Sequence, residues 1–524
     1  MPRVRMSHEE IVIGLLVAIV LLTSLSVRLQ IAYPIILIIG GLALGFIPGL
    51  PRVQLDPDLV FLVFLPPLLY WEAVTAPYRE YRRNLRPILL LAVGLVLATI
   101  AAVATISHVL IGFAWPVAIV LGSVVAPTDE VAVLAIADRL GLPRRTIAIL
   151  EGESLLNDVS SLVIYGAATA VLTTGTFSAP SAVRDLLLAP LGGAAIGVAA
   201  GWFVIQVRRV LAPPAVVAST ISLLSGFLAY LPAEALHLSG ILASVAMGLF
   251  VGRRTAFIES GTRLQAEEMW EVLTSVINSV LFILVGLQLP VILEALTMPL
   301  GELLREAALI CLTVVVLRIM WIFAAAYVPR AVSRKLRTRD PAPPWQHVAV
   351  LSWSGLRGAV SLAAALALPT TLRLGAPFPE RGPIIFLTFS VIVVTLVLQG
   401  LTLPSLISFL KVHEDDEESR EEDHARLLIA RAALRRLSSL GERDGIPSHL
   451  IEDLRHHLQH SIDGYAEATL PGPRASDTDA SERMWRLMLA AERNELFRLR
   501  EIGVIDNDVM RRILRDIDLK EVSL

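Results

Sequence analysis

The 524-residue sequence has one cysteine, Cys311, and comparatively few aromatic or charged residues. A single cysteine excludes a framework of disulfides within the chain. Charged residues make up 18% of the sequence and the formal net charge is −3, so the basic excess typical of nucleic-acid binding is missing and no nucleic-acid partner is expected. There is no G-x-S-x-G elbow and no phosphate-binding loop, and His108 and His237 stand alone in unrelated apolar segments. We therefore expect neither an enzyme nor a cofactor.

Long apolar runs dominate what is present. Hydrophobic residues make up 55% of the chain and the mean hydropathy is +0.67, whereas soluble proteins average roughly 45–50% apolar. The runs approach the ~20 residues needed to cross a bilayer, and the first lacks a small-residue cleavage site, which favours a spanning helix over a signal peptide. The pattern predicts about thirteen spans, near 10–27, 33–49, 58–76, 87–113, 116–137, 147–173, 185–207, 214–231, 235–251, 269–290, 303–328, 345–369 and 383–410.

Arginines in the loops predict how these spans are oriented. Basic clusters follow every second span, at 79–86, 139–145, 208–209, 253–254 and 330–339. The positive-inside rule places such loops in the cytoplasm. With an odd number of spans, the N-terminus is then outside and the C-terminal tail is cytoplasmic, although Arg3 and Arg5 run against this orientation. We expect a multi-pass protein of the cell inner membrane.

Two of the predicted spans are interrupted at their middle. The span 116–137 carries Pro127, Thr128, Asp129 and Glu130 at its centre, and the span 345–369 carries a Gly-Leu-Arg-Gly run there. Broken backbone at membrane depth is tolerated only where protein or water satisfies the freed polar groups. Two broken helices in corresponding halves are typical of secondary transporters built from inverted repeats, whose half-helix ends face a central ion site.

A third span is polar on one side. Within LEGESLLND, Glu151, Ser154 and Asp158 share one helical stripe, and Glu153 and Asn157 form a second row beside it. Serine and asparagine could simply join neighbouring helices by hydrogen bonds. Carboxylates at membrane depth are too costly for that use, so they indicate a proton or cation site.

Buried charges should be paired where they do not bind something else. Two arginines at membrane depth can neutralise two acids, so at least one acid is left to bind a cation or a proton. Hard oxygen ligands of this kind favour alkali cations. The acids are Glu72, Asp129, Glu153 and Asp158, and the bases are Arg318 and Arg357.

Five segments carry a specific family resemblance. They are LPPLLYWEA, APTDEVAVLAI, EGESLLNDVSSLVIY, NSVLFILVGLQL and SWSGLRGAVSLAAALALP. Together they resemble the cation:proton antiporter-1 family, and within it the bacterial sodium/proton exchangers. The resemblance covers residues 10–410 and implies an all-α membrane fold of thirteen helices with inverted repeats and two discontinuous crossing helices. It also implies a mobile core domain, a dimerisation domain and a homodimer in the lipid bilayer.

The resemblance assigns roles to the polar residues of the interrupted and polar spans. Asp158 matches the acid that binds a cation and a proton in turn, and Asn157 matches the neighbour that holds the site. Thr128 and Asp129 match the unwound segment at which one of the two interrupted helices crosses the other. The resemblance thus implies that Na⁺ is held by Asp158, Glu72, Ser154 and a backbone carbonyl of Thr128.

The same resemblance accounts for the remaining buried charges. Glu153 and Arg318 match a structural ion pair, and Arg357 matches an arginine that stabilises the crossing. Glu130 departs from the family pattern, where many relatives have proline or a small residue. It could reach the ion path or pair with an arginine, and we expect a structural or tuning role. The family pairs an Asn-Asp motif with one-for-one exchange, so transport by this chain should be electroneutral.

The chain beyond the spans is soluble in character. We expect a transmembrane antiporter domain at 1–410, an acidic linker at 411–424 and a helical cytoplasmic domain at 425–524. Helical periodicity is visible at 424–440, 449–463 and 481–503. For the whole protein, two alternatives stay open beside sodium/proton antiport: potassium/proton antiport through the same site, and a cation channel.

Overall fold

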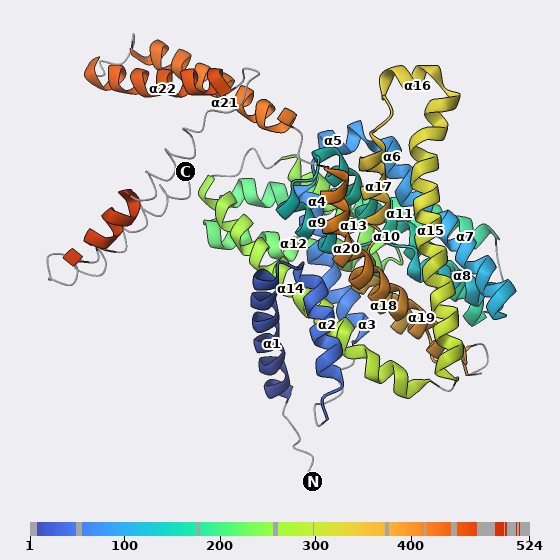
Figure 1. Ribbon diagram of the computed structural model, residues 1–524. Helices are drawn as coiled ribbons and strands as arrows, with labels where there is room; N and C mark the ends of the chain where they lie inside the picture. The colour runs from blue at the N-terminus through green and yellow to red at the C-terminus, as the bar shows by residue number, and fades with distance from the viewer. Residues whose placement is uncertain are drawn as a thin grey trace. The chain divides into compact units, whose positions relative to one another are not determined.

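The computed structural model consists of helices joined by loops in the residues that it describes (Figure 1), with an isolated β-bridge between Thr371 and Pro377. The chain divides into two compact units, Met1–Glu414 and Asp415–Leu524. The described residues are 8–48, 55–174, 179–254, 260–296, 298–372, 377–412, 416–441, 448–468, 488–496, 498–499, 510 and 513.

The first half of the membrane unit consists of helices with several π-helical turns. These turns widen spans without ending them, and such turns are frequent at functional sites. The elements are α1 (His8–Leu29), α2 (Tyr33–Gly45), α3 (Pro57–Leu59), η1 (Val60–Phe64), α4 (Leu65–Thr75), α5 (Tyr78–Arg83), α6 (Leu85–Leu89), η2 (Leu90–Leu95), α7 (Val96–Ile106), η3 (Ser107–Ile111), α8 (Trp115–Val125), α9 (Val131–Leu140), α10 (Arg144–Thr174), α11 (Ala179–Leu211), α12 (Ala215–Ala235) and α13 (Gly240–Gly252).

The second half of the membrane unit is also helical and contains one more π-helical turn. Over both halves together, the described residues include nine continuous helical stretches that are long and apolar enough to cross a membrane, and three shorter apolar helices. The multi-pass all-α fold is therefore confirmed, while the count of thirteen spans stays a prediction. The elements are α14 (Ser260–Ala295), α15 (Leu300–Val332), α16 (Arg334–Arg339), α17 (Trp345–Trp353), α18 (Ala359–Leu366), α19 (Arg381–Val393), η6 (Val394–Gln399) and α20 (Gly400–Leu410).

Small residues let neighbouring helices approach closely. A methyl group at Gly41 of α2 would collide with the Ile283 carbonyl of α14, and one at Gly286 would collide with the Ile38 carbonyl. Glycine at both positions thus removes the side chains that would hold the two backbones apart. Membrane helices associate by such packing, because lipid supplies no hydrophobic driving force between them.

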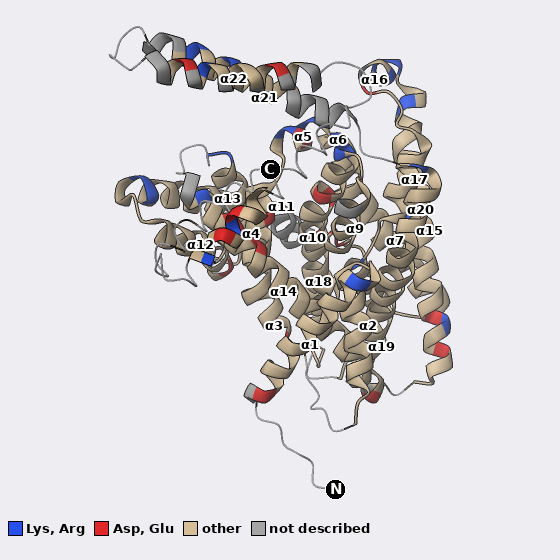
Figure 2. Ribbon diagram, turned by 60° about the vertical axis from the view of Figure 1, so that its left-hand side comes forward, with Lys and Arg blue, Asp and Glu red and all other residues tan. Residues whose placement is uncertain are grey.

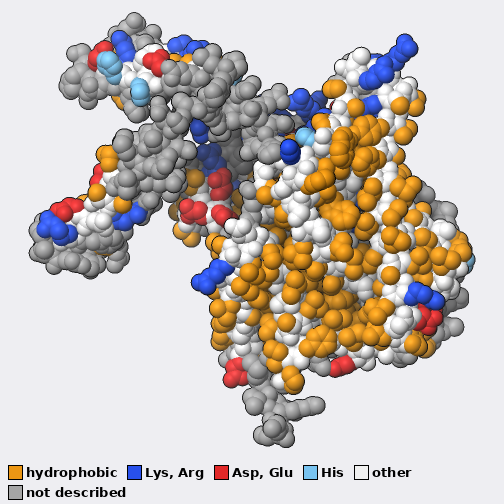
Figure 3. All heavy atoms as spheres, in the orientation of Figure 1, with side chains coloured by type: hydrophobic (Ala, Val, Ile, Leu, Met, Phe, Trp, Pro, Cys, Tyr) orange, Lys and Arg blue, Asp and Glu red, His pale blue; other side chains and the backbone are white. Residues whose placement is uncertain are grey.

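The outside of the membrane unit is apolar, as a lipid-facing surface must be. Hydrophobic side chains cover a broad face of it (Figure 3). The exposed hydrophobic residues include Val20 of α1 and Leu312 of α15, which are each 63% exposed. Arginines gather on α5, α6 and α16 at one end (Figure 2). This distribution agrees with a bundle whose middle lies in hydrocarbon and whose basic end lies at a headgroup layer.

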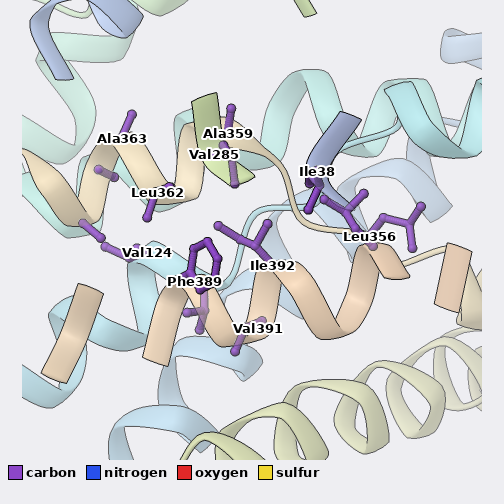
Figure 4. Close-up of a cluster of buried hydrophobic side chains, with 14 of the residues drawn as sticks. Ile38, Val124, Val285, Leu356, Ala359, Leu362, Ala363, Phe389, Val391 and Ile392 are labelled. Carbon is purple, nitrogen blue, oxygen red and sulfur yellow. The ribbon is translucent and has the colours of Figure 1, made fainter. Parts of the chain in front are cut away.

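Apolar side chains hold the two interrupted helices together. Val124 of α8 lies close to Leu362 and Ala363 of α18 and to Phe389 of α19 (Figure 4), and all four are buried in one hydrophobic cluster. Ile392 of α19 extends the same cluster. The close packing of protein interiors leaves little room for these half-helices to shift independently.

The second unit contains α21 (Asp416–Gly441) and α22 (Ser448–Ala468), which pack through Leu427, Ala430 and Ile462. Within the segment 411–424, predicted as an acidic linker, α21 begins at Asp416, and glutamate, the commonest residue of the segment, is a good helix former. Much of the helix predicted at 481–503 lies outside the described residues.

Candidate functional site

The two broken helices meet at their breaks. α8 ends at Val125 and α9 begins at Val131, while α17 ends at Trp353 and α18 begins at Ala359. The backbone N–H of Asp129 in the first break donates to the Leu356 carbonyl in the second, at 2.9 Å. The two discontinuous crossings are therefore present, and each supplies a backbone partner that the other lost.

The local sequence explains the first break. Pro127 has no N–H to continue the α8 ladder, and the Asp129 carboxylate accepts from the Val131 N–H at 2.9 Å, which caps the start of α9. Gly358 lies against that carboxylate, and a side chain there would collide with it. Glycine at 358 is thus required for the two breaks to touch.

Thr128 forms hydrogen bonds with three polar side chains of α10. Its backbone carbonyl accepts from Ser154 at 3.0 Å and from the Asn157 amide at 3.3 Å, and its hydroxyl accepts from the same amide at 2.8 Å. The Thr128 hydroxyl in turn donates to Glu153 at 3.0 Å. The two polar rows expected on this helix therefore converge on one residue of the crossing.

Glu153 and Arg318 form a two-point ion pair at the centre of the bundle. Nη1 of Arg318 lies 2.5 Å from Oε1 of Glu153, and Nη2 lies 3.0 Å from Oε2. Both side chains are buried, with exposed fractions of 1% for Arg318 and 2% for Glu153. This geometry agrees with the pairing that the sequence suggested.

Arg357 differs from the expectation that each buried arginine faces an acid. Among the described contacts its guanidinium donates to the carbonyls of Val125, at 3.3 Å, and Gly355. Its backbone N–H donates to the Thr395 hydroxyl at 3.2 Å. Carbonyls at a helix break have lost their own N–H partners, so an arginine that satisfies them replaces the missing turn of backbone.

A cavity of about 60 Å³ lies beside the first break. None of the described residues that line it is basic. Asp158 is 8% exposed and Glu130 is 7% exposed, so both acids are nearly withdrawn from solvent. The polar lining consists of Glu72, Thr128, Asp129, Glu130, Ser154, Asp158, Asn278 and Ser361.

The predicted site residues separate into two groups. The first group lines the cavity together with Thr128, and it consists of Glu72, Asp129, Ser154 and Asp158. The second group does not line the cavity but bonds to the residues of the first break: Glu153, paired with Arg318, accepts from Thr128, and Arg357 donates to the Val125 carbonyl. Asn157 holds Thr128. Glu151, which shares the helical stripe of Asp158, is approached instead by the Tyr81 hydroxyl at 3.5 Å.

Sequence reasoning assigned no role to Asn278 or Ser361. Both lie within segments quoted for the family resemblance, and both contribute to the cavity lining. The remaining signal was weak, because one amide or hydroxyl in a membrane helix is commonly a packing device.

The cavity has the chemistry of a site for a proton or an alkali cation. A carboxylate withdrawn from water needs a positive charge, and the lining supplies none of its own. Among the described residues, no three His, Cys, Asp or Glu side chains are grouped to hold a metal ion. Beside its carboxylates, the lining offers the hydroxyl groups of Thr128, Ser154 and Ser361 as further oxygen ligands for a cation.

Comparison with known proteins identifies the family. Residues 14–408 match the model of the sodium/hydrogen exchanger transmembrane family. An uncharacterized Na⁺/H⁺ exchanger of Mycobacterium tuberculosis is 36% identical over 98% of this chain and 96% of its own length. A sodium, potassium, lithium and rubidium/H⁺ antiporter of Bacillus pumilus is 31% identical over 86% of this chain and 70% of its own length.

The fold agrees with this assignment. The structure of the sodium proton antiporter MjNhaP1 from Methanocaldococcus jannaschii superimposes with a TM-score of 0.59. It has 19% sequence identity, and the match covers 77% of this chain and 99% of that one. The chain therefore belongs to the sodium/hydrogen exchanger family.

Proposed function

We propose that this protein exchanges sodium for protons across the cell membrane by alternating access, with both ions competing for Asp158. The observation that carries the proposal is the acidic cavity at the meeting point of the two broken helices, which has no basic residue among its described lining. A carboxylate there is neutralised either by a proton or by a cation.

Competition at one acid explains the coupling. A bare carboxylate is costly to carry through a low-dielectric barrier, whereas a site loaded with Na⁺ or H⁺ is electrically compensated. The loaded site can change its exposure from one side of the membrane to the other, and the empty site cannot do so cheaply. A gradient of either ion then drives the other ion in the opposite direction.

The neighbours of Asp158 supply the other oxygens for Na⁺. Glu72, Ser154 and Thr128 line the cavity together with Asp158, and we propose the Thr128 backbone carbonyl as a further ligand. Asn157 fixes that carbonyl through its amide. Asp129 is occupied in capping α9, so it shapes the site and adds negative charge to it.

The stoichiometry follows from the amide at position 157. Asn157 cannot carry a proton, and Glu153 is already neutralised by Arg318. One-for-one exchange then requires that Asp158 alone alternates its charge, while the other acids of the cavity, Glu72, Asp129 and Glu130, keep theirs constant through the cycle.

Potassium/proton exchange is the second candidate. The Bacillus pumilus relative is named for sodium, potassium, lithium and rubidium, and oxygen ligands alone do not select among these ions. A cation channel, the remaining alternative, would require a continuous pore and would show conductance, which distinguishes it from an exchanger.

We also propose the arrangement of the protein in the cell. The basic ends of the spans face the cytoplasm, the N-terminus lies outside and the C-terminal unit is cytoplasmic. The protein works as a homodimer, and the transmembrane antiporter domain ends near residue 410.

Proton flux in vesicles containing the purified protein tests the proposal. Wild type should move protons when a Na⁺ gradient is imposed, and Asp158→Asn should abolish this flux while the protein stays folded and inserted. Trials with K⁺ and Li⁺ across a pH series identify the preferred cation. Substantial Na⁺-driven flux through well-folded Asp158→Asn would disprove the assignment of Asp158.

A further inference from the structure

Three arginines from separate segments surround one carboxylate at an end of the bundle. Nη2 of Arg145, at the start of α10, lies 2.8 Å from Oδ1 of Asp340. Nη2 of Arg330, near the end of α15, lies 2.5 Å from Oδ2, and its Nε donates to the Asp340 backbone carbonyl at 3.0 Å. Nη1 of Arg86, in α6, is 3.8 Å from Oδ2. We call these four residues the arginine cluster.

The charges of the arginine cluster do not balance. Three guanidinium groups carry three positive charges and Asp340 carries one negative charge, which leaves an excess of two. The described contacts bring no second acid to the cluster. Arg145 also lies in the first turn of α10, where the helix dipole is positive and a cation is unfavourable. The site therefore attracts an anion beyond Asp340.

Arg86 is the member whose hydrogen bonds are least satisfied. Its 3.8 Å approach to Asp340 is an ion pair but is too long for a hydrogen bond. Its Nη2 atom is buried and has no hydrogen-bond partner among the described residues. A buried donor without a partner is costly, and an unseen ion or water is a common reason for one. The Arg86 side chain as a whole is 34% exposed, so part of it is open to an anion, although Nη2 itself is buried.

The position of the cluster indicates which anions it meets. Arg86 and Arg145 each lie at the start of a membrane-spanning helix, and Arg330 lies near the end of one. The exposed arginines of α5 occupy the same end (Figure 2). Residues at the ends of membrane-spanning helices are expected at the depth of the lipid headgroups. Planar guanidinium groups match the oxygens of phosphate in two-point contacts.

We propose that Arg86 and Arg145 bind a phosphate group beside Asp340, supplied by an anionic lipid headgroup or by free phosphate. Arg330 is buried and already uses its donors on Asp340 and the Ala326 carbonyl, so it anchors Asp340 and does not contact the ligand. The bound phosphate joins the starts of α6 and α10 to the end of α15. It thereby stabilises the helices that carry Asp158 and Arg318, whether or not the protein transports sodium.

Thermal unfolding of the purified full chain tests the site. The protein is placed in nanodiscs of phosphatidylcholine, in nanodiscs that also contain phosphatidylglycerol, and in phosphatidylcholine nanodiscs with inorganic phosphate. Sodium chloride matches the ionic strength, because general screening would otherwise shift all variants. We expect the midpoint to rise with phosphatidylglycerol or phosphate, and Arg86→Gln and Arg145→Gln to weaken the apparent affinity by roughly tenfold or more.

Two further variants distinguish a phosphate-binding site from a structural clamp, by which we mean ion pairs that only hold the helices together. Arg83→Gln removes an exposed arginine from the same end, and it should respond as wild type does. Asp340→Asn removes the competing carboxylate, so it should bind phosphate more tightly even if it unfolds more easily without the ligand. A structural clamp alone would lose stability in Asp340→Asn without any gain in affinity.

The pattern of responses identifies the source of the phosphate. A response to phosphatidylglycerol alone assigns a lipid headgroup, a response to inorganic phosphate alone assigns a soluble anion, and a response to both assigns the phosphate group itself. The proposal is overturned if neither ligand shifts the wild type. It is also overturned if Arg86→Gln and Arg145→Gln respond as strongly as Arg83→Gln.

Discussion

The buried pair of Glu153 and Arg318 gives the sharpest energetic prediction. Its two-point geometry, at 2.5 and 3.0 Å, and exposed fractions of 1% and 2% leave neither charge accessible to water. Replacing either residue by methionine leaves the other charge unpaired in a low-dielectric interior. We expect each single variant to be destabilised by about 3–5 kcal/mol.

The double variant should behave differently. Replacing a buried ion pair by apolar residues of similar size is often neutral or stabilising, because the desolvation cost disappears together with the attraction. Glu153→Met with Arg318→Met should therefore recover most of the stability that each single change loses. The Thr128 hydroxyl, which donates to Glu153 at 3.0 Å, loses that acceptor in the double variant, so recovery should be incomplete.

Denaturant unfolding in one detergent, analysed as a double-mutant cycle, measures the coupling between the two positions. Arg305→Met is the matched control, because Arg305 lies in the same helix, is 77% exposed and is 3.9 Å from Glu302. A surface pair of this kind contributes about 0–1 kcal/mol. If the double variant loses as much stability as the sum of the two single variants, the residues are not energetic partners.

Three further outcomes are expected. Gly358→Ala should abolish transport, because the added methyl group collides with the Asp129 carboxylate, and flux in vesicles measures this. Burial raises the pKa of Asp340, but Arg145 and then Arg330 outweigh it by hydrogen bonds and charge, so the pKa is held below its ordinary value. The resulting stabilisation is present above about pH 4 and is lost as the pH falls through the lowered pKa, so the stability difference between wild type and Asp340→Asn should vanish in acid. Finally, a voltage clamped by potassium and valinomycin should leave the reversal point of Na⁺-driven flux unchanged, because Asn157 carries no proton, whereas a net charge would contribute about 2.3 kcal/mol per 100 mV.

The sequence was sufficient for features that depend on the residues of one segment. Pro127 and the Gly-Leu-Arg-Gly run predict breaks in apolar helices, and helical spacing places Ser154 and Asp158 on one face. These conclusions follow from backbone geometry and from the cost of charge in a membrane. The structure contains both breaks and brings both side chains to one cavity.

The sequence was insufficient where the partner is a backbone group or a distant helix. Arg357 bonds to the carbonyls of Val125 and Gly355, and a freed carbonyl leaves no mark in the sequence. Glu151 shares a helical stripe with Asp158, but it is approached by the Tyr81 hydroxyl. The two residues are seven positions apart, so different neighbouring helices contact them. Periodicity gives the direction of a side chain and not the helix that it meets.

The arrangement of charges suggests how Asp158, the proposed carrier acid, could change its charge without disturbing the fold. The Glu153–Arg318 pair is neutral as a unit, and among the described hydrogen bonds it is linked to the cavity lining through the Thr128 hydroxyl. That contact helps to hold the Thr128 carbonyl, which is proposed as an ion ligand, and it adds no net charge to the lining. The energy of loading a cation is then decided at Asp158 and the acids beside it, while the crossing of the two helices is held by groups whose charge stays constant. If Asp158 binds the transported ions as proposed, a change of ion there would alter the electrostatics of the cavity and leave its scaffold in place.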